Sequence, residues 1–207
     1  MNRSKKALVS NILLLIMEVV GVVVMFVQSG YVDLKYYTNW SNILGLISAV
    51  LFLICYINKE RNKVLNDALK YFKLTSTICL TVTILVVVFM FVPMDNFNFY
   101  RWVIRDNFFS FHLISPIIAF ITFMFFEKYD YEYIKDTIIG LVFTIIYSVV
   151  VCILILLKKI SAPYPFLDLY AHSVIVNIIN LTLLLLAIIG LTLLFIFIKR
   201  KNKNMVE

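Results

Sequence analysis

Charged residues are scarce in this chain. Only 15% of its 207 residues are Asp, Glu, Lys or Arg, whereas 62% are hydrophobic and the mean hydropathy is +0.95. A soluble globular domain carries about 25% charged residues, so this composition excludes that class. The three cysteines and two histidines show neither CxxC spacing nor Cys next to His. We therefore expect no metal site and no other cofactor.

Glycine is also rare, with five residues. Neither a glycine-rich phosphate loop nor a G-x-S-x-G elbow occurs, so the standard motifs of soluble enzymes are absent. The connections between the hydrophobic runs are too short for a soluble domain, and no internal repeat typical of secondary transporters is visible.

Long hydrophobic runs dominate the sequence. Six of them have about 20 residues or more, enough to cross roughly 30 Å of hydrocarbon, and they cover residues 7–28, 37–57, 71–92, 108–126, 134–157 and 170–198. The first run is longer than the apolar region of a signal peptide and lacks an A-x-A cleavage site, so we interpret it as a retained helix. The sequence predicts an all-α polytopic membrane protein, a single bundle of six transmembrane helices over residues 1–207.

The net charge of +7 has an uneven distribution along the chain. If both termini are cytoplasmic, 14 of the 19 Lys and Arg residues lie on that side, as the positive-inside rule requires. We therefore interpret the basic charge as an orientation signal, with attraction to anionic lipid headgroups as the alternative. Membrane lipid is the expected partner and nucleic acid is not. Ile, Asn, Lys, Phe and Tyr are abundant, as AT-rich codons favour, which suggests a bacterium with low GC content as the source. We therefore expect the protein in a bacterial cytoplasmic (plasma) membrane. The oligomeric state stays open.

Polar residues collect at the outer start of the second run, in "YYTNWSN" (36–42). Helical spacing places Thr38, Ser41, Asn42 and Gly45 on one face. Small and polar residues form packing seams between membrane helices, which explains the part of this face around Gly45. Thr38 is either an N-cap of the helix or a functional group.

Both histidines lie on the outer side. His112 stands about one turn inside the fourth run, where an ionisable group indicates function unless it is a neutral imidazole bonded to a neighbouring helix. His172 has Asp168 four residues before it, a helical spacing that lets a carboxylate orient an imidazole. The spacing alone does not choose between the two histidines.

Glu18 lies near the middle of the first run and must be neutral, paired or hydrated. Arg101 and Arg105 are the outer-side cations that could pair with it, and a protonated carboxyl bonded to a polar neighbour is the alternative. The segment "PYPFLD" (163–168), which includes Tyr164, is interpreted either as a stiff interfacial loop or as the lining of a lipid entrance.

Together these outer-side residues include the groups that acyl transfer needs. Thr38 supplies a hydroxyl that requires a base, His112 or His172 supplies that base, and the amides of Asn39 and Asn42 could stabilise an oxyanion. A site among helix ends suits a substrate with a long acyl chain.

The motifs "YYTNWSN", "FHLISP" and "PYPFLD" resemble the androgen-induced-protein family of six-helix membrane hydrolases and its small bacterial relatives. The resemblance covers the whole chain in order and topology. It implies a threonine hydrolase that cleaves fatty acid esters of hydroxy fatty acids, with Thr38 as nucleophile and His112 as base. The alternative hypothesis is a non-catalytic protein for lipid binding or transport, in which Thr38, Asn42 and His112 bond the helices together.

Overall fold

The computed structural model describes residues 3–58, 63–105 and 109–204. Within these ranges it contains six helices that are long and apolar enough to cross a membrane, and no β-strand. The predicted all-α, six-helix architecture is confirmed.

The six spans are α1 (Arg3–Ser29), α2 (Tyr37–Ile57), α3 (Lys63–Val86), a broken fourth span, α6 (Tyr133–Leu156) and α7 (Val174–Asn204). The third begins at Lys63 rather than at residue 71, because the charged segment before the apolar run is also helical. It continues through the π-helix η1 (Val87–Phe91) into the short α4 (Val92–Met94), and η2 (Tyr100–Ile104) follows. The sixth begins at Val174 rather than at 170, which leaves His172 outside the helix.

The fourth span consists of η3 (Phe109–Ile114), α5 (Ser115–Ile121) and η4 (Thr122–Phe126), where both η segments are π-helical. Pro116 lies in the first turn of α5. Proline has no N–H for the carbonyl one turn earlier, and a local π-helical turn is one way to accommodate it in a membrane helix. The change from π-helix to α-helix follows His112 by three residues.

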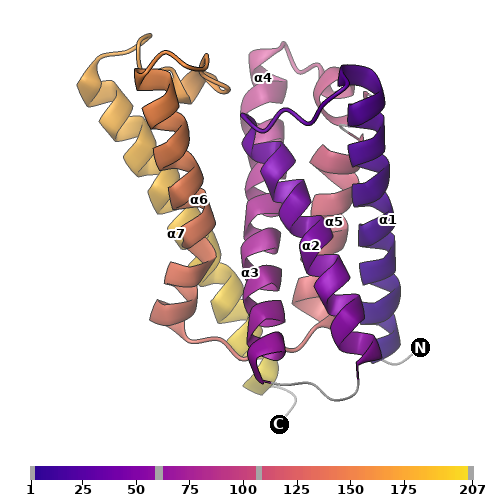
Figure 1. Ribbon diagram of the computed structural model, residues 1–207. Coiled ribbons are helices and arrows are strands. Elements are labelled where there is room, and N and C mark those ends of the chain that lie inside the picture. The colour runs from indigo at the N-terminus through magenta and orange to yellow at the C-terminus, as the bar shows by residue number, and fades with distance from the viewer. Residues whose placement is uncertain (1–2, 59–62, 106–108, 205–207) are drawn as a thin grey trace.

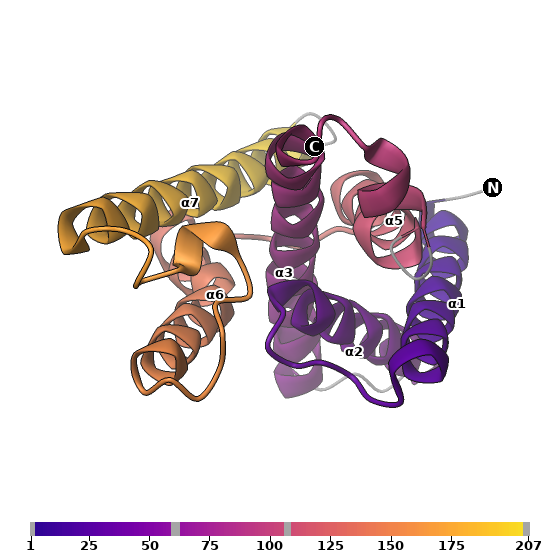
Figure 2. The ribbon, with the colours of Figure 1, turned by 90° about the horizontal axis from the view of Figure 1, so that it is seen from above.

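Helix α3 stands at the centre and contacts α2, α5, α6 and α7. Seen from above in Figure 2, α1, α2, α3 and α5 form one cluster, while α6 and α7 lie together on the other side of α3. Consecutive residues around α3, such as Ile78, Cys79 and Leu80, are fully buried, because helices cover it on all sides.

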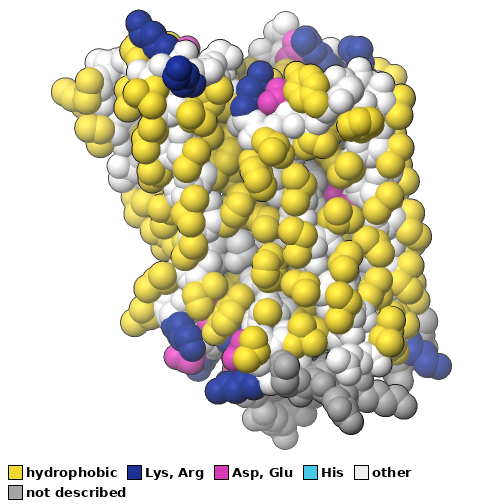
Figure 3. Space-filling model, viewed as in Figure 1, with side chains coloured by type: hydrophobic (Ala, Val, Ile, Leu, Met, Phe, Trp, Pro, Cys, Tyr) yellow, Lys and Arg dark blue, Asp and Glu magenta, His cyan; other side chains and the backbone are white. Residues whose placement is uncertain are grey.

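The outer surface of the bundle is apolar. Figure 3 shows hydrophobic side chains over the middle of the molecule, with a small acidic patch among them, while Lys, Arg and most Asp and Glu side chains gather at its two ends. This distribution matches a bilayer core between two polar interfaces. Both termini lie at one end of the bundle (Figure 1), which we call the terminal end. The opposite end, where α2 begins, is called the pocket end.

Candidate functional site

A cavity of about 610 Å³ lies at the pocket end. The end of α1, the start of α2, the segments between α3 and α5, and the loop before α7 surround it. Thr38, Asn39, His112 and Tyr164 are all among its lining residues. Four candidates from three widely separated parts of the sequence therefore share one cavity.

Thr38 occupies the first turn of α2, where backbone N–H groups have no acceptor within the helix. Its N–H donates instead to the Tyr164 hydroxyl at 3.3 Å. The N-cap of α2 is Tyr36, so the cap interpretation of Thr38 is wrong. The Thr38 side chain is half-buried and remains available to the cavity.

His112 is 5% exposed and is held by the backbone of η2. Its Nδ1 lies 2.7 Å from the carbonyl oxygen of Trp102. Because a carbonyl oxygen only accepts, Nδ1 carries the proton of the neutral ring and Nε2 is its acceptor nitrogen. This tautomer is the one that a general base requires. The Trp102 ring in turn stacks on Phe91 at a centroid distance of 4.8 Å.

Tyr164 connects the loop before α7 to the start of α2. Its ring is 5% exposed and stacks on Phe91 at 5.8 Å. Burial raises the pKa of Tyr164 to about 12, and hydrogen bonds with Thr38 act in the opposite direction. The phenol is consequently neutral near pH 7 and can donate a hydrogen bond beside Thr38.

The other polar residues of "YYTNWSN" hold the start of α2 in place. The Asn39 amide donates to the carbonyl of Asp33 at 2.8 Å, and the Asn42 amide donates to the carbonyl of Thr38 at 2.6 Å. The Ser41 hydroxyl shares a 2.8 Å hydrogen bond with Thr83 of α3. These contacts fix the start of α2 around Thr38, and Asn39 also lines the cavity.

Asp168 and His172 do not meet on a helix. Oδ1 of Asp168 accepts from the backbone N–H groups of Tyr170 and Ala171, at 3.1 and 3.2 Å, and so closes a turn. His172 is exposed. Neither residue is among the described lining of the 610 Å³ cavity.

Arg101 and Arg105 are exposed at the pocket end. Arg101 pairs with Asp95, with Nη1 and Oδ2 3.3 Å apart. Glu18 is fully buried, and neither of its carboxyl oxygens has a hydrogen-bond partner among the described residues. Of the alternatives left open for Glu18, pairing with Arg101 is therefore not found.

A second, narrow cavity of about 40 Å³ borders the first one. It lies between α2, α3, α6 and α7, and its lining is mostly apolar, including Val82, Val86 and Leu184. Thr38 and Tyr164 line both cavities. Thr38 therefore stands where a narrow apolar cavity meets a larger cavity of mixed lining.

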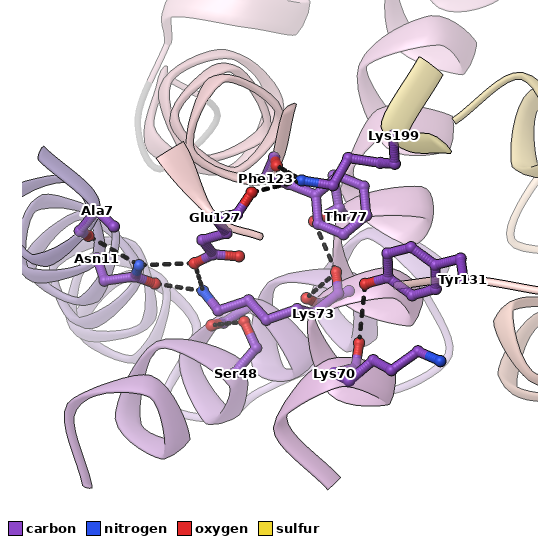
Figure 4. A network of polar contacts seen from close by, with 12 residues as sticks. Ala7, Asn11, Ser48, Lys70, Lys73, Thr77, Phe123, Glu127, Tyr131 and Lys199 are labelled. Atoms are coloured by element: carbon purple, nitrogen blue, oxygen red, sulfur yellow. Dashed lines mark hydrogen bonds and ion pairs between the residues drawn. The ribbon is translucent and has the colours of Figure 1, made fainter. Parts of the chain in front are cut away.

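A buried polar network at the terminal end was missed by the sequence analysis (Figure 4). Lys73 Nζ of α3 lies 3.2 Å from Oε1 of Glu127, which also accepts from the Asn11 amide at 2.8 Å. Lys199 of α7 donates to the carbonyl oxygens of Glu127 and Phe123. The sequence did hold a sign of this network, because Asn11 and Lys73 are polar residues within predicted hydrophobic runs. This network joins four spans.

Comparison with known protein families, with curated protein sequences and with solved structures gave no match. In the part of the chain that the structure describes, no group of three or more His, Cys, Asp or Glu side chains could hold a metal ion.

Proposed function

We propose that the protein is a membrane-embedded hydrolase of lipid-like esters, with Thr38 as nucleophile and His112 as base. The observation that carries this proposal is that both residues line one 610 Å³ cavity. The cavity would face the outer side of a bacterial plasma membrane, with both termini in the cytoplasm, in accord with the distribution of Lys and Arg.

In the proposed reaction, Oγ1 of Thr38 attacks the ester carbonyl carbon while its proton passes to Nε2 of His112. The tetrahedral intermediate collapses when the alcohol leaves with that proton. Water then attacks the acyl-threonine, again with His112 as base, and releases the carboxylic acid. The cycle returns both side chains to their starting states.

The oxyanion would be stabilised by two donors beside Thr38. One is its own backbone N–H, at the positive end of the α2 dipole. The other is the neutral Tyr164 hydroxyl, to which that N–H now donates. A substrate oxygen between them would replace the present hydrogen bond.

The border position of Thr38 also supports an ester with one apolar part. Thr38 lines both the narrow apolar cavity between α3 and α7 and the larger cavity, whose lining also includes polar side chains. An acyl chain would enter from the apolar side, and the alcohol part would occupy the larger cavity.

The test is hydrolysis of p-nitrophenyl acyl esters by the purified protein in detergent micelles. Thr38→Ala and His112→Ala should each lower kcat/KM by about 10²–10⁴-fold, whereas His172→Ala, at the exposed histidine, should leave it unchanged. Equal activity in folded Thr38→Ala and wild-type protein would favour the non-catalytic lipid-binding alternative.

A further inference from the structure

Glu18 is a polar residue in the middle of the bundle, and the proposed reaction does not use it. We refer to its level in the bundle, with Gly45 and Ser115, as the Glu18 layer. Its side chain is fully buried, and neither carboxyl oxygen has a hydrogen-bond partner among the described residues. A Cβ atom added to Gly45 of α2 would lie 2.5 Å from Oε1, so the carboxyl group lies directly against that glycine. The Ser115 hydroxyl of α5 adjoins the carboxyl group, and it is also buried without a hydrogen-bond partner among the described residues.

The layer one turn closer to the terminal end is mostly apolar, and its buried Ser48 hydroxyl is bound to the carbonyl of Gly45. Leu14 lies one turn from Glu18, Ala49 lies one turn from Gly45, and Ala119 lies one turn from Ser115. These three residues pack with Leu80 of α3 in one buried cluster. The cluster separates Glu18 from the Lys73–Glu127 network.

The layer one turn closer to the pocket end is polar. Asn42 precedes Gly45 by one turn and donates to the carbonyl of Thr38. His112 precedes Ser115 by one turn and lines the 610 Å³ cavity. On this side, polar side chains lead from Glu18 toward an open cavity.

The titratable groups near Glu18 lie either toward the pocket end or beyond the apolar cluster. On η3 the titratable neighbour is His112, and the part of α2 beside Glu18 carries no titratable side chain. From α3, Cys79 faces Thr144 at 3.9 Å, and Lys73 is bound to Glu127 and Asn11 beyond the apolar cluster. A carboxylate in this layer would have no cation beside it, and an unpaired charge within a membrane is costly. The carboxyl group is consequently neutral and carries a proton.

We propose that Glu18 is a proton-binding site within the membrane, and that it exchanges its proton with the pocket-end cavity through Ser115 and His112. On release, the carboxyl proton passes to the Ser115 oxygen while the Ser115 proton passes to Nε2 of His112, which delivers it to the cavity. One proton moves and Glu18 becomes a carboxylate. The Phe111 ring lies against Gly21 one turn above Glu18, so the site is closed at rest and exchange is slow. This proposal shares Nε2 of His112 with the proposed reaction, but it does not require that the protein hydrolyses esters.

The first test is labelling with dicyclohexylcarbodiimide, a lipophilic reagent that modifies protonated carboxyl groups. The acid adds across one C=N bond, its proton goes to nitrogen, and acyl migration gives a stable N-acylurea without a leaving group. At pH 8, where an exposed Glu is ionised, mass spectrometry should find one adduct on Glu18 and none on Glu127, whose carboxyl group is ion-paired. Wild-type protein without a Glu18 adduct would overturn the proposal. So would at least tenfold suppression of labelling by NaCl relative to KCl, since that result indicates a metal-cation site.

The second test determines the side from which the proton arrives. In vesicles with the protein in one orientation, the labelling rate of Glu18 should follow the pH on the pocket side. Ser115→Ala should reduce the effect of pocket-side pH on the labelling rate at least tenfold. The control Ser76→Ala, at a buried serine bonded to the carbonyl of Lys73, should leave that effect unchanged. A labelling rate that follows the pH on the terminal side would overturn the proposed route. The variant Glu18→Gln has no carboxyl group at this position, so loss of the adduct in this variant identifies Glu18 as the labelled residue.

Discussion

Replacing either member of the buried Lys73–Glu127 pair tests the network that joins the spans at the terminal end. The two side chains are 3% and 1% exposed and their charged atoms lie 3.2 Å apart. Removing one partner of a buried ion pair costs about 3–5 kcal/mol, because the other charge remains without compensation.

The structure ranks the two substitutions within that range. Lys199 Nζ donates to the Glu127 carbonyl oxygen at 2.7 Å, so two ammonium groups share the region of one carboxylate. Glu127→Gln removes the carboxylate from beside two buried ammonium groups, and we expect a loss of about 5 kcal/mol. Lys73→Met leaves Glu127 with the ammonium of Lys199 nearby, and we expect about 3 kcal/mol.

The assay is reversible unfolding by sodium dodecyl sulfate in mixed micelles, followed by circular dichroism. Asp95→Asn serves as the control, because Asp95 pairs with the exposed Arg101 and a surface pair contributes about 0–1 kcal/mol. Equal losses for Glu127→Gln and Lys73→Met, or a loss for either no larger than that of Asp95→Asn, would refute the reasoning.

Three further outcomes follow from local geometry. Gly45→Ala should cost about 1–3 kcal/mol through overpacking, since the new Cβ would lie 2.5 Å from Oε1 of Glu18. Gly190→Ala should instead stabilise α7 by up to about 1 kcal/mol through helix propensity, because nothing lies within 4 Å of that Cβ; the same unfolding assay measures both, and an equal cost for both glycines would contradict the packing argument. Tyr164→Phe should lower kcat of ester hydrolysis by about 10²–10³-fold with little change in KM, as loss of an oxyanion donor does; a raised KM at unchanged kcat would assign Tyr164 to binding alone.

The spans were predictable because each is a continuous apolar run of membrane-crossing length. The start of α3 was not, since "KVLNDALK" has too many charges to resemble a membrane segment, yet helical structure extends beyond the hydrocarbon. The start of α7 was placed too early because apolar and aromatic residues around Tyr170 continue the hydrophobic run although the backbone there forms turns.

Individual site residues were predictable to the extent that local spacing determines their neighbours. The stripe from Thr38 to Gly45 follows from helical periodicity, and Ser41 and Asn42 do face the interior of the bundle. The 610 Å³ cavity depends on η2, which brings the Trp102 carbonyl to His112, and on the loop that carries Tyr164. No local pattern encodes these contacts between distant segments. For the same reason, helical spacing suggested Asp168 as a partner of His172, although no helix forms there.

The central claim is that Thr38 is a nucleophile activated by His112. The most direct measurement is the site of covalent modification by an alkyl fluorophosphonate, in which the attacking oxygen forms a P–O bond as fluoride leaves. Mass spectrometry of the purified protein should find a single adduct on Thr38 that persists in His172→Ala and disappears in folded His112→Ala. An adduct at another residue, or equal modification of Thr38 with and without His112, would contradict the account.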